Sequence, residues 1–555
     1  MADTANGWPF LYTNLVIPLT IIDQAMPQIV IIGAGVGGLA FAIALRRQLG
    51  FDDFIIYEKA SDVGGTWRDN IYPGASSDVG MHFYSLSTDL NPEWRATHGS
   101  QPEMHDYWRK LTAKYNLYSR TVFNRLVTSA EWSNKDELYH IVSEDVVTGE
   151  QFTTTAKILI SAIGILEIPN FPSIAGLSSF KGDMFHSARW NKAVDLRGKR
   201  VAVIGNGASA TQFVPLISED SSVQITEFCR TPNWFLPLPR GGYTPRWKWA
   251  FRNVPGAMRL HRFTLYLRSE LMYRLVFANK FISSKFVNVA KHYITNTAPK
   301  EELGRLIPNY SPGCKRVIFD TNYLEALHRP NLKLNWDGIQ SICEDGIITK
   351  KGDKLSFDVL IFCDRLHCGP VPTSCRRQYD SQDSPRLLRF TWRTHGVFGD
   401  HGPRFSQSVP LSRPEYRDRP HLGPTHRGTT VLLRQTGYIM QLIKPILNGS
   451  ISSVDVKPSA TDAYNDVIQA RLSRSVFVEC TSWYRAGGDG KVTSTFPGPM
   501  FLFGWWVRRP KWEDYNVKAT TNEWELKLRY ERLMALFNPM HYVAFLFGFF
   551  VWAIS

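Results

Sequence analysis

Short apolar runs alternate with amphipathic segments along the first two thirds of the chain. Residues 28–32 (QIVII) are apolar, a glycine-rich turn follows, and apolar positions then recur with a helical period as far as Gly50. A second apolar run at 53–59 (DFIIYEK) comes directly afterwards. A strand, a tight turn, a helix and a second strand form the βαβ unit of parallel sheets. The pattern therefore predicts an α/β protein built on a parallel sheet.

The same pattern recurs at 199–217 (KRVAVIGNGASATQFVPLI), where an apolar strand again ends in a glycine turn before a helix. A further strand is predicted at 223–234, and another at 357–362 (FDVLIF). Residues 240–300 are rich in aromatic residues and in Lys and Arg, and we expect them to form a helical insertion near the substrate. Two copies of the unit predict two nucleotide-binding domains.

The first turn has the spacing G-x-G-x-x-G at Gly33, Gly35 and Gly38. Such a turn lets the backbone approach a pyrophosphate closely and lets the helix pack against the strand. Glu58 ends the second strand twenty residues after Gly38, where an acid can bind ribose hydroxyls. These features predict a dinucleotide site, and a glycine turn with a purely structural role is the alternative.

The second turn contains Gly205 and Gly207, with Ala210 in the third small position. Arg230 follows the next strand, where an NAD site favours an acid. A guanidinium there can pair with the 2′-phosphate of NADP, so we expect NADP, and a surface Arg without a ligand is the alternative. Two dinucleotide folds in one chain imply two dinucleotides, most commonly FAD and a nicotinamide.

Composition narrows the class of protein. The 555 residues are 44% hydrophobic and 21% charged, which is typical of a globular chain. The net charge is +14, but no block of Lys and Arg resembles a nucleic-acid arm, so we expect anionic cofactors and no nucleic acid. Seven cysteines without a CxxC motif favour a reducing compartment, no disulfide framework and no metal site. No secretory signal is recognisable, and a cytoplasmic protein is expected.

The C-terminal residues 542–555 (YVAFLFGFFVWAIS) are apolar but shorter than the ~20 residues of a spanning helix. Pro539 and His541 prevent a longer apolar run. We expect a packed or interfacial terminal helix, and a membrane anchor is the alternative.

A glycine- and aromatic-rich loop at 62–87 carries a more specific signal. The motif GGTW, then N-x-Y-P-G, then an Asp resembles the FAD-binding region of flavin-dependent monooxygenases of the Baeyer–Villiger type. The family often has Arg or Ala and then Cys before that Asp, where Ser76 and Ser77 stand here. The resemblance implies FAD contacts from Gly65, Thr66, Trp67, Asn70, Tyr72, Asp78 and Tyr84.

Three further segments resemble the same family. Residues 180–191 (FKGDMFHSARWN) fit its fingerprint F-x-G-x-x-x-H-x-x-x-W, although Asn191 replaces the usual Pro or Asp. Residues 480–500 and 508–515 resemble its C-terminal region. The implied fingerprint residues are Phe180, Gly182, His186 and Trp190, with His186 coupling the two cofactor domains and carrying no proton.

Residues 311–334 resemble the family segment that carries two cations. Lys315, with Ser209 and Thr231, is implied to bind NADP. Arg316 is implied to pair with Asp78, so that both act in catalysis and the cation steadies negative charge on the oxygenated flavin. Val317 stands where the family usually has Pro.

Residues 363–434 do not fit. Positions 364–434 contain 12 Arg and no Lys, and no amphipathic period survives. The four groups Cys363, His367, Cys368 and Cys375 match no zinc spacing. Shifted by one base, the first residues can encode ATGFIADQ, and two later stretches can encode GGPTAYLGTTVPGFPN and GPNTATGHTSVL. All three resemble family motifs in the correct order, so we interpret the segment as translated out of frame.

The predicted architecture has an FAD domain with an NADP domain inserted into it, both Rossmann-like, plus the helical insertion. The expected boundaries are 1–27 (extension), 28–190 and 435–536 (FAD domain), 191–362 (NADP domain), 363–434 (anomalous) and 537–555 (tail). The resemblance implies NADPH- and O2-dependent oxidation of a bulky apolar ketone to an ester or lactone, by analogy in fungal secondary metabolism. The alternatives are N- or S-hydroxylation and an inactive chain.

Overall fold

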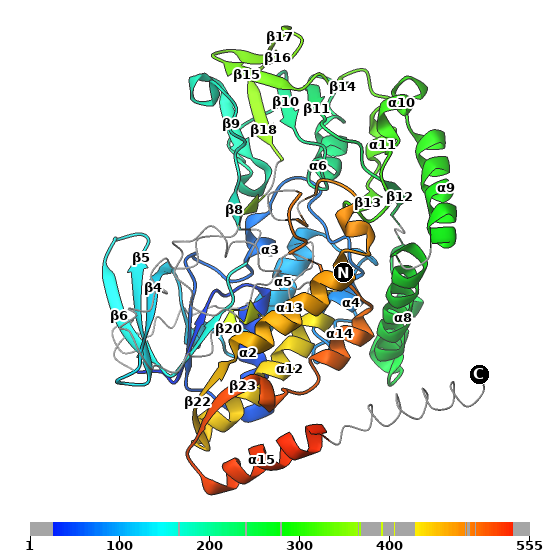
Figure 1. Ribbon diagram of the computed structural model, residues 1–555. Coiled ribbons are helices and arrows are strands. Elements are labelled where there is room, and N and C mark those ends of the chain that lie inside the picture. Colours follow the sequence, from blue (N-terminus) through cyan, green and yellow to red (C-terminus); the bar gives the residue numbers. More distant parts are fainter. Residues whose placement is uncertain are drawn as a thin grey trace, which may run out of the picture.

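The protein is described by a computed structural model, in which two parallel sheets lie in two lobes (Figure 1). The N-terminal extension, the C-terminal tail and most of the predicted out-of-frame segment lie outside the described residues. The structure describes residues 26–164, 167–238, 241–277, 280–363, 366–367, 390–391, 404–405, 428–482, 484–485, 489–493 and 495–536.

The first sheet has the strand order β21-β20-β7-β1-β2-β3. Its centre is parallel, because β1 (Ile29–Ile32) pairs in register with both β2 (Phe54–Tyr57) and β7 (Ile158–Ser161). Every residue of these three strands is buried, which explains their uninterrupted apolar sequences. The outer strands are β3 (Thr121–Val122), β20 (Phe390–Thr391) and β21 (Arg404–Phe405).

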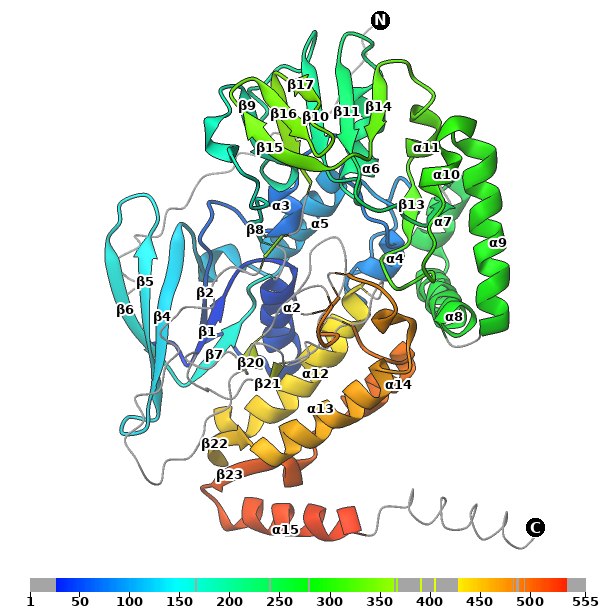
Figure 2. The same ribbon diagram turned by 45° about the horizontal axis from the view of Figure 1, so that its top comes forward.

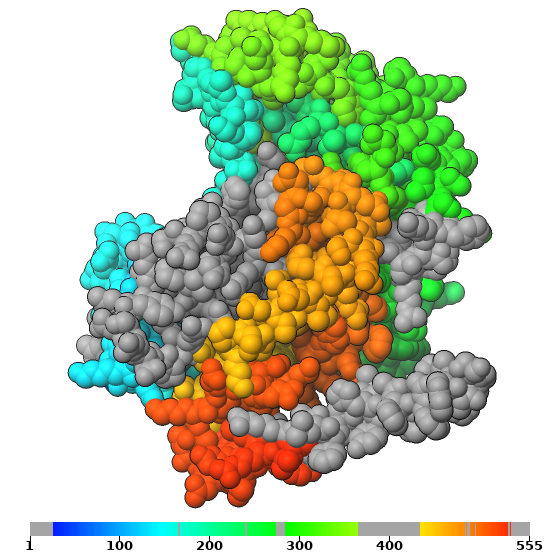
Figure 3. All heavy atoms as spheres, viewed as in Figure 1, coloured from blue at the N-terminus to red at the C-terminus, as the bar shows by residue number. Residues whose placement is uncertain are grey.

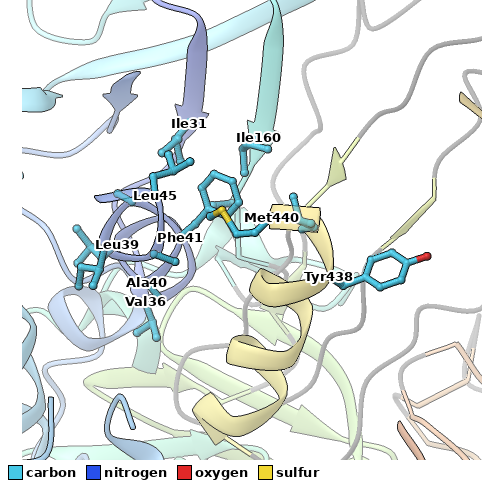
Figure 4. Close-up of a cluster of buried hydrophobic side chains, with 14 of the residues drawn as sticks. Ile31, Val36, Leu39, Ala40, Phe41, Leu45, Ile160, Tyr438 and Met440 are labelled. Carbon is cyan, nitrogen blue, oxygen red and sulfur yellow. The ribbon is translucent and has the colours of Figure 1, made fainter. Parts of the chain in front are cut away.

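Helix α2 (Val36–Ala44) packs on one face of this sheet, and α12 (Gly428–Leu447) packs against α2 in the same core. In Figure 4, Phe41 of α2 lies between Ile160 of β7 and Met440 of α12. Residues from the two ends of the chain therefore share one core, as expected for an FAD domain interrupted by an insertion.

The second sheet has the order β14-β11-β10-β18-β9 and is parallel throughout. Helix α6 (Ala210–Ile217) follows the second glycine turn and packs on this sheet. Its strands are β9 (Asp183–His186), β10 (Arg200–Ile204), β11 (Gln224–Phe228), β14 (Leu332–Asn335) and β18 (Val359–Phe362).

The second domain is an insertion in the first, as predicted. The chain leaves the first sheet through β8 (Ile168–Pro169) and returns through β19 (Leu366–His367), and these two strands pair antiparallel. The expected boundary after residue 190 lies too late, because β9 already pairs with β18 of the second sheet. Its partly exposed sequence DMFH lacks the apolar run by which the other strands were recognised.

The expected helical insertion consists of α7 (Pro245–Asn253), α8 (Ala257–Phe277) and α9 (Lys280–Thr297), at the edge of the molecule in Figures 1 and 2. In Figure 3 its green surface adjoins the orange surface of the C-terminal segment. The remaining elements are α3 (Thr66–Asp69), α4 (Met81–Tyr84), α5 (Gln101–Lys114), β4 (Arg125–Ser133), β5 (Leu138–Asp145), β6 (Gln151–Ala156), β12 (Phe235–Pro237), α10 (Leu303–Leu306), β13 (Ile318–Asp320), α11 (Tyr323–Ala326), β15 (Ile339–Cys343), β16 (Gly346–Thr349), β17 (Lys354–Ser356), β22 (Ile451–Val456), α13 (Pro458–Leu472), α14 (Met500–Trp506), β23 (Tyr515–Ala519) and α15 (Asn522–Leu536).

One prediction from the cysteine count is wrong. Cys314 and Cys480 form a disulfide with a Cα–Cα distance of 5.9 Å across 166 residues of sequence. Spacing along the chain could not show this pairing, because it joins a loop of the second domain to the C-terminal part of the first. Cys229, Cys343 and Cys363 are the free cysteines of the described ranges.

None of the helices in the described part of the chain combines the length and the hydropathy needed to span a bilayer. Over the same residues, no group of three or more His, Cys, Asp or Glu is arranged to hold a metal ion.

Candidate functional site

The first glycine turn joins β1 to α2 and has no room for side chains at two positions. Gly33 has a φ of +100°, and a Cβ there would lie 3.0 Å from the Ala162 carbonyl oxygen. A Cβ on Gly38 would lie 2.0 Å from the Gly33 carbonyl oxygen. Gly35 lies against Gly65 of the GGTW motif, which places the two sequence motifs side by side. No side chain caps the N-terminus of α2 and no acid occupies its first turn, so its N–H groups suit a pyrophosphate.

Glu58 lies at the end of β2, beneath the same turn. One of its carboxylate oxygens accepts the Ala34 N–H at 2.7 Å, and the other accepts from Arg68 Nη1 at 3.2 Å. The side chain is buried. Glu58 therefore fixes the turn, and its predicted contact with a ribose stays a prediction.

The GGTW motif begins a short packed unit. Gly64 and Gly65 have φ values of +115° and +53°, and α3 starts immediately afterwards. Trp67 is fully buried, and its Nε1 donates to the Tyr84 hydroxyl at 3.4 Å. Asn70 Nδ2 donates to the Thr66 carbonyl at 3.0 Å. Trp67 thus anchors the loop to the core of the first domain.

The two domains meet where this loop contacts α6. The Tyr72 hydroxyl donates to Gln212 Oε1 at 2.9 Å, and Gln212 Nε2 donates to the Ser76 carbonyl at 3.2 Å. Gly74 has a φ of +75°, and a Cβ there would lie 2.6 Å from the Gln212 carbonyl. Gln212 was not predicted from the sequence, where its signal is a long amide side chain on a mostly apolar helix.

A buried ion pair lies in the same region. Arg316 Nη2 contacts Asp78 Oδ2, and only 11% and 10% of the two side chains is exposed. Asp78 Oδ1 is buried and has no hydrogen-bond partner among the described residues. The structure therefore brings together the two residues for which catalytic roles were predicted.

Tyr72 lies close to this ion pair and to the second turn. Burial raises the pKa of its hydroxyl to about 12. A hydrogen bond with Ser209 and the positive charge of Arg316 act in the opposite direction and lower this pKa. Tyr72 is therefore a neutral hydrogen-bond donor at physiological pH.

The second glycine turn joins β10 to α6. Gly205 has a φ of +106°, and a Cβ on Gly207 would meet open space. Asn206 Nδ2 donates to the Thr231 carbonyl at 3.0 Å, and Lys315 Nζ donates to Thr231 Oγ1 at 3.0 Å. The turn, Thr231 and Lys315 thus lie together at the carboxyl ends of β10 and β11.

The other residues predicted for the second nucleotide flank this group. Arg230 is exposed directly before Thr231. Ser209 precedes Ala210, which is fully buried and begins α6. Arg230 makes no ion pair among the described residues, so its guanidinium is accessible to a ligand.

The fingerprint connects the two domains through aromatic rings. Trp190 lies edge-on to Phe213 of α6 at 5.1 Å, and Phe213 lies 6.1 Å from Tyr72. His186 is buried, and its Nδ1 accepts the Ala188 N–H at 3.0 Å. A Cβ on Gly182 would lie 2.4 Å from the Asp358 carbonyl and 2.7 Å from the Phe180 ring.

The residues present fit two dinucleotides. At the second glycine turn a Cβ on Gly207 would meet open space, and Arg230 and Lys315 lie beside the turn to neutralise a phosphate. Asp78 Oδ1 offers a buried acceptor in the loop that follows the GGTW motif. This donor and acceptor set matches FAD in the first domain and NADP in the second.

Comparisons with known proteins agree. Residues 30–228 match the family described as pyridine nucleotide-disulphide oxidoreductase. A Baeyer–Villiger monooxygenase of Pseudomonas aeruginosa is 32% identical over 89% of this chain and 92% of its own length. An FAD-binding monooxygenase of Aspergillus niger is 30% identical over 90% of this chain and 83% of its own.

Solved structures show the same fold. A cyclohexanone monooxygenase of Rhodococcus bound to NADP+ aligns with a TM-score of 0.71 at 21% identity, over 89% of this chain and 100% of that one. The sequence relatives and the two nucleotide folds lead to one conclusion. The chain belongs to the Baeyer–Villiger and related FAD-binding monooxygenases.

Proposed function

We propose that this monooxygenase inserts one atom of O2 beside the carbonyl of a bulky apolar ketone, which gives an ester or lactone. The observation that carries the proposal is the buried pair of Arg316 and Asp78, which joins the loop after the first glycine turn to the loop that also carries Lys315. The chemistry that bound FAD and NADPH supply is a two-electron reduction and the activation of O2.

Arg316 supplies a fixed cation where negative charge develops on oxygen. A guanidinium keeps its proton even in a dry site, and the buried carboxylate of Asp78 holds it in place. The preorganised charge then costs no reorganisation during the reaction. Asp78 Oδ1 remains to accept a hydrogen bond from the bound cofactor or substrate.

Lys315 and Arg230 select the nicotinamide cofactor. Lys315 is held by Thr231 and lies over the Tyr310 ring at 5.1 Å, so its ammonium is positioned before a ligand arrives. Two cations beside the second glycine turn favour a 2′-phosphate, which supports NADPH over NADH.

Aromatic contacts keep water from the junction. Trp190, Phe213 and Tyr72 form a continuous contact between the domains, and the aromatic-rich insertion adjoins the first domain at α4. A dry, apolar boundary suits a bulky apolar ketone.

The test is an aerobic assay of the purified chain with NADPH and a panel of cyclic and fused-ring ketones. We expect NADPH oxidation coupled to ester or lactone, identified by mass spectrometry with one label from 18O2. NADPH oxidation without oxygen in any ketone would contradict the proposal. Amines and sulfides in the same assay test N- or S-hydroxylation, which the Trp190 fingerprint and the Asp78–Arg316 pair disfavour.

A further inference from the structure

The helical insertion holds most of the net positive charge of the protein. Residues 241–298 contain ten Lys or Arg, and Glu270 is their only acid. This gives a net charge of +9 in these residues, compared with +14 for the whole chain. A concentration of charge in one surface element points to an anionic partner.

Helix α8 presents an apolar face to the outside. Leu260, Phe263, Leu267 and Leu271 recur every three or four residues, and they are 65%, 53%, 49% and 57% exposed. This spacing places them on one side of the helix. Over the residues of α8 whose side chains are described, 257–273, the outward face consists of Arg259, Leu260, Phe263, Thr264, Leu267, Arg268, Leu271 and Met272. These eight residues include two cations and no acid.

The inward face of α8 carries the charges that a surface helix usually directs to water. Arg262 Nη1 donates to the carbonyls of His82 and Ser85, each at 2.6 Å. The Glu270 carboxylate accepts the Met500 N–H at 2.7 Å. The inward face thus buries charged groups beside Leu265 and Tyr266, which pack on the core, and leaves four large apolar side chains facing outward.

The neighbouring helix α9 provides an internal comparison. Over residues 284–297, whose side chains are described, its outward positions are polar or basic apart from Val289, and they comprise Ser284, Lys285, Asn288, Lys291, His292, Thr295 and Asn296. In this part of α9 the outward face is therefore polar, in contrast to the outward face of α8.

Exposed aromatic residues also occur on two helices that contact α8. Trp247 and Trp249 of α7 are 52% and 61% exposed, and the Trp247 ring lies 5.9 Å from the His261 ring of α8. Phe501 and Trp505 of α14 are 53% and 49% exposed, and the bond between Met500 and Glu270 ties α14 to α8. The helices α8 and α14 are neighbours in Figures 1 and 2.

We propose that the outward face of α8 docks this enzyme on the surface of an anionic lipid bilayer. Leucine and phenylalanine enter the headgroup boundary, tryptophan prefers that interface, and arginine pairs with lipid phosphates. A second copy is a poor occupant because two such basic surfaces repel each other. Nucleic acid would use the cations but leave the apolar stripe uncovered.

The test is flotation of the full-length, flavin-loaded protein with vesicles of phosphatidylcholine alone or with 30% phosphatidylserine. We expect binding to the mixed vesicles that weakens as salt is raised. The variant Phe263→Glu with Leu267→Glu should reduce the partition coefficient at least ~10-fold, because two apolar anchors become anions. The matched variant Asn288→Glu with Asn296→Glu adds the same charge to α9 and should bind at least threefold more tightly than the α8 variant.

Retained flavin absorbance shows that each variant is folded. Absence of binding to either vesicle would overturn the proposal, and so would equal binding by the α8 variant and the wild type. If the wild type and the α9 variant form a stable dimer and the α8 variant is a monomer, a second copy covers this face instead. None of these outcomes depends on whether a ketone is oxidised.

Discussion

Arg316 and Lys315 are neighbours in sequence, yet they contact different parts of the site. Arg316 faces Asp78 of the FAD domain, and Lys315 faces Thr231 of the NADP domain. We expect Arg316→Ala to lower ester formation about 100- to 1000-fold, the usual cost of losing a charge-stabilising donor. Flavin absorbance should be retained. The measurement is kcat for ester by mass spectrometry, and a loss below fivefold would refute the role of Arg316.

Lys315→Ala should act on cofactor affinity instead. Loss of one charge-assisted contact weakens binding by about 1.5–3 kcal/mol, so KM for NADPH should rise about 10- to 100-fold. KM for NADH should change little, which separates recognition of the phosphate from general damage. Lys199→Ala, an exposed lysine of the same domain, is the control and should leave both values unchanged.

Glu227 predicts a pH dependence of stability. It is buried on β11, where loss of solvation raises the pKa of the carboxyl to about 8, and the Tyr323 hydroxyl donates to it at 2.6 Å. The folded state therefore holds a proton that the unfolded state releases near pH 4.5. Its contribution to stability is complete below that pH and is lost as pH rises through about 8.

The variant Glu227→Gln tests whether Glu227 lowers the stability of the protein as pH rises. The amide keeps the shape and removes the titration, so the melting temperature of the variant minus that of the wild type should increase from pH 5 to pH 9. A difference that is flat with pH, or that decreases, would show that Glu227 is ionised in the folded protein.

At the level of elements, the sequence predicts features formed within one segment, and it does not predict contacts between segments that only the fold brings together. The two glycine turns follow from sequence because a positive φ at Gly33 and Gly205 excludes other residues. The pair of Arg316 and Asp78 was inferred from resemblance alone, since 238 positions separate them. Gln212 was missed because only the docked domains give a buried amide its partners.

The disulfide is the clearest case of an assembled feature. Cys314 directly precedes Lys315, so the link to Cys480 tethers the cation-bearing loop to the C-terminal part of the FAD domain. Closing a loop of this length stabilises a protein by about 2–5 kcal/mol. We expect Cys314→Ser, or reduction of the wild type, to lower the melting temperature by several degrees. Cys343→Ser removes a free cysteine and should have little effect.

At the scale of the whole molecule, the two sheets and their glycine turns account for both cofactors. The two domains are joined by two connections, β8 and β19, which pair side by side between the lobes. Both connections therefore limit how far the second domain can move from the first. The segment that follows β19 is where sequence and family disagree.

Residues 363–434 are the segment that we interpret as translated out of frame. The second domain is intact as far as its last strand, β18, and α12 resumes the core of the first domain with Tyr438, Ile439 and Met440. A segment translated out of frame between two intact elements would explain why flanking motifs survive while Arg replaces Lys within it. We propose that the natural protein carries the shifted reading, because all three recovered motifs occur in the family order.

Peptide mass mapping of the natural protein across residues 355–440 decides this. We expect peptides that contain GGPTAYLGTTVPGFPN, together with full flavin content. Peptides that end in RLHCGPVPTSCR would show that the printed chain is translated. That chain has lost the glycine-containing turn expected after β18, a turn that brings backbone close to a cofactor. Weak flavin binding and little oxygenation would then follow, and the activity proposed above would belong only to the corrected sequence.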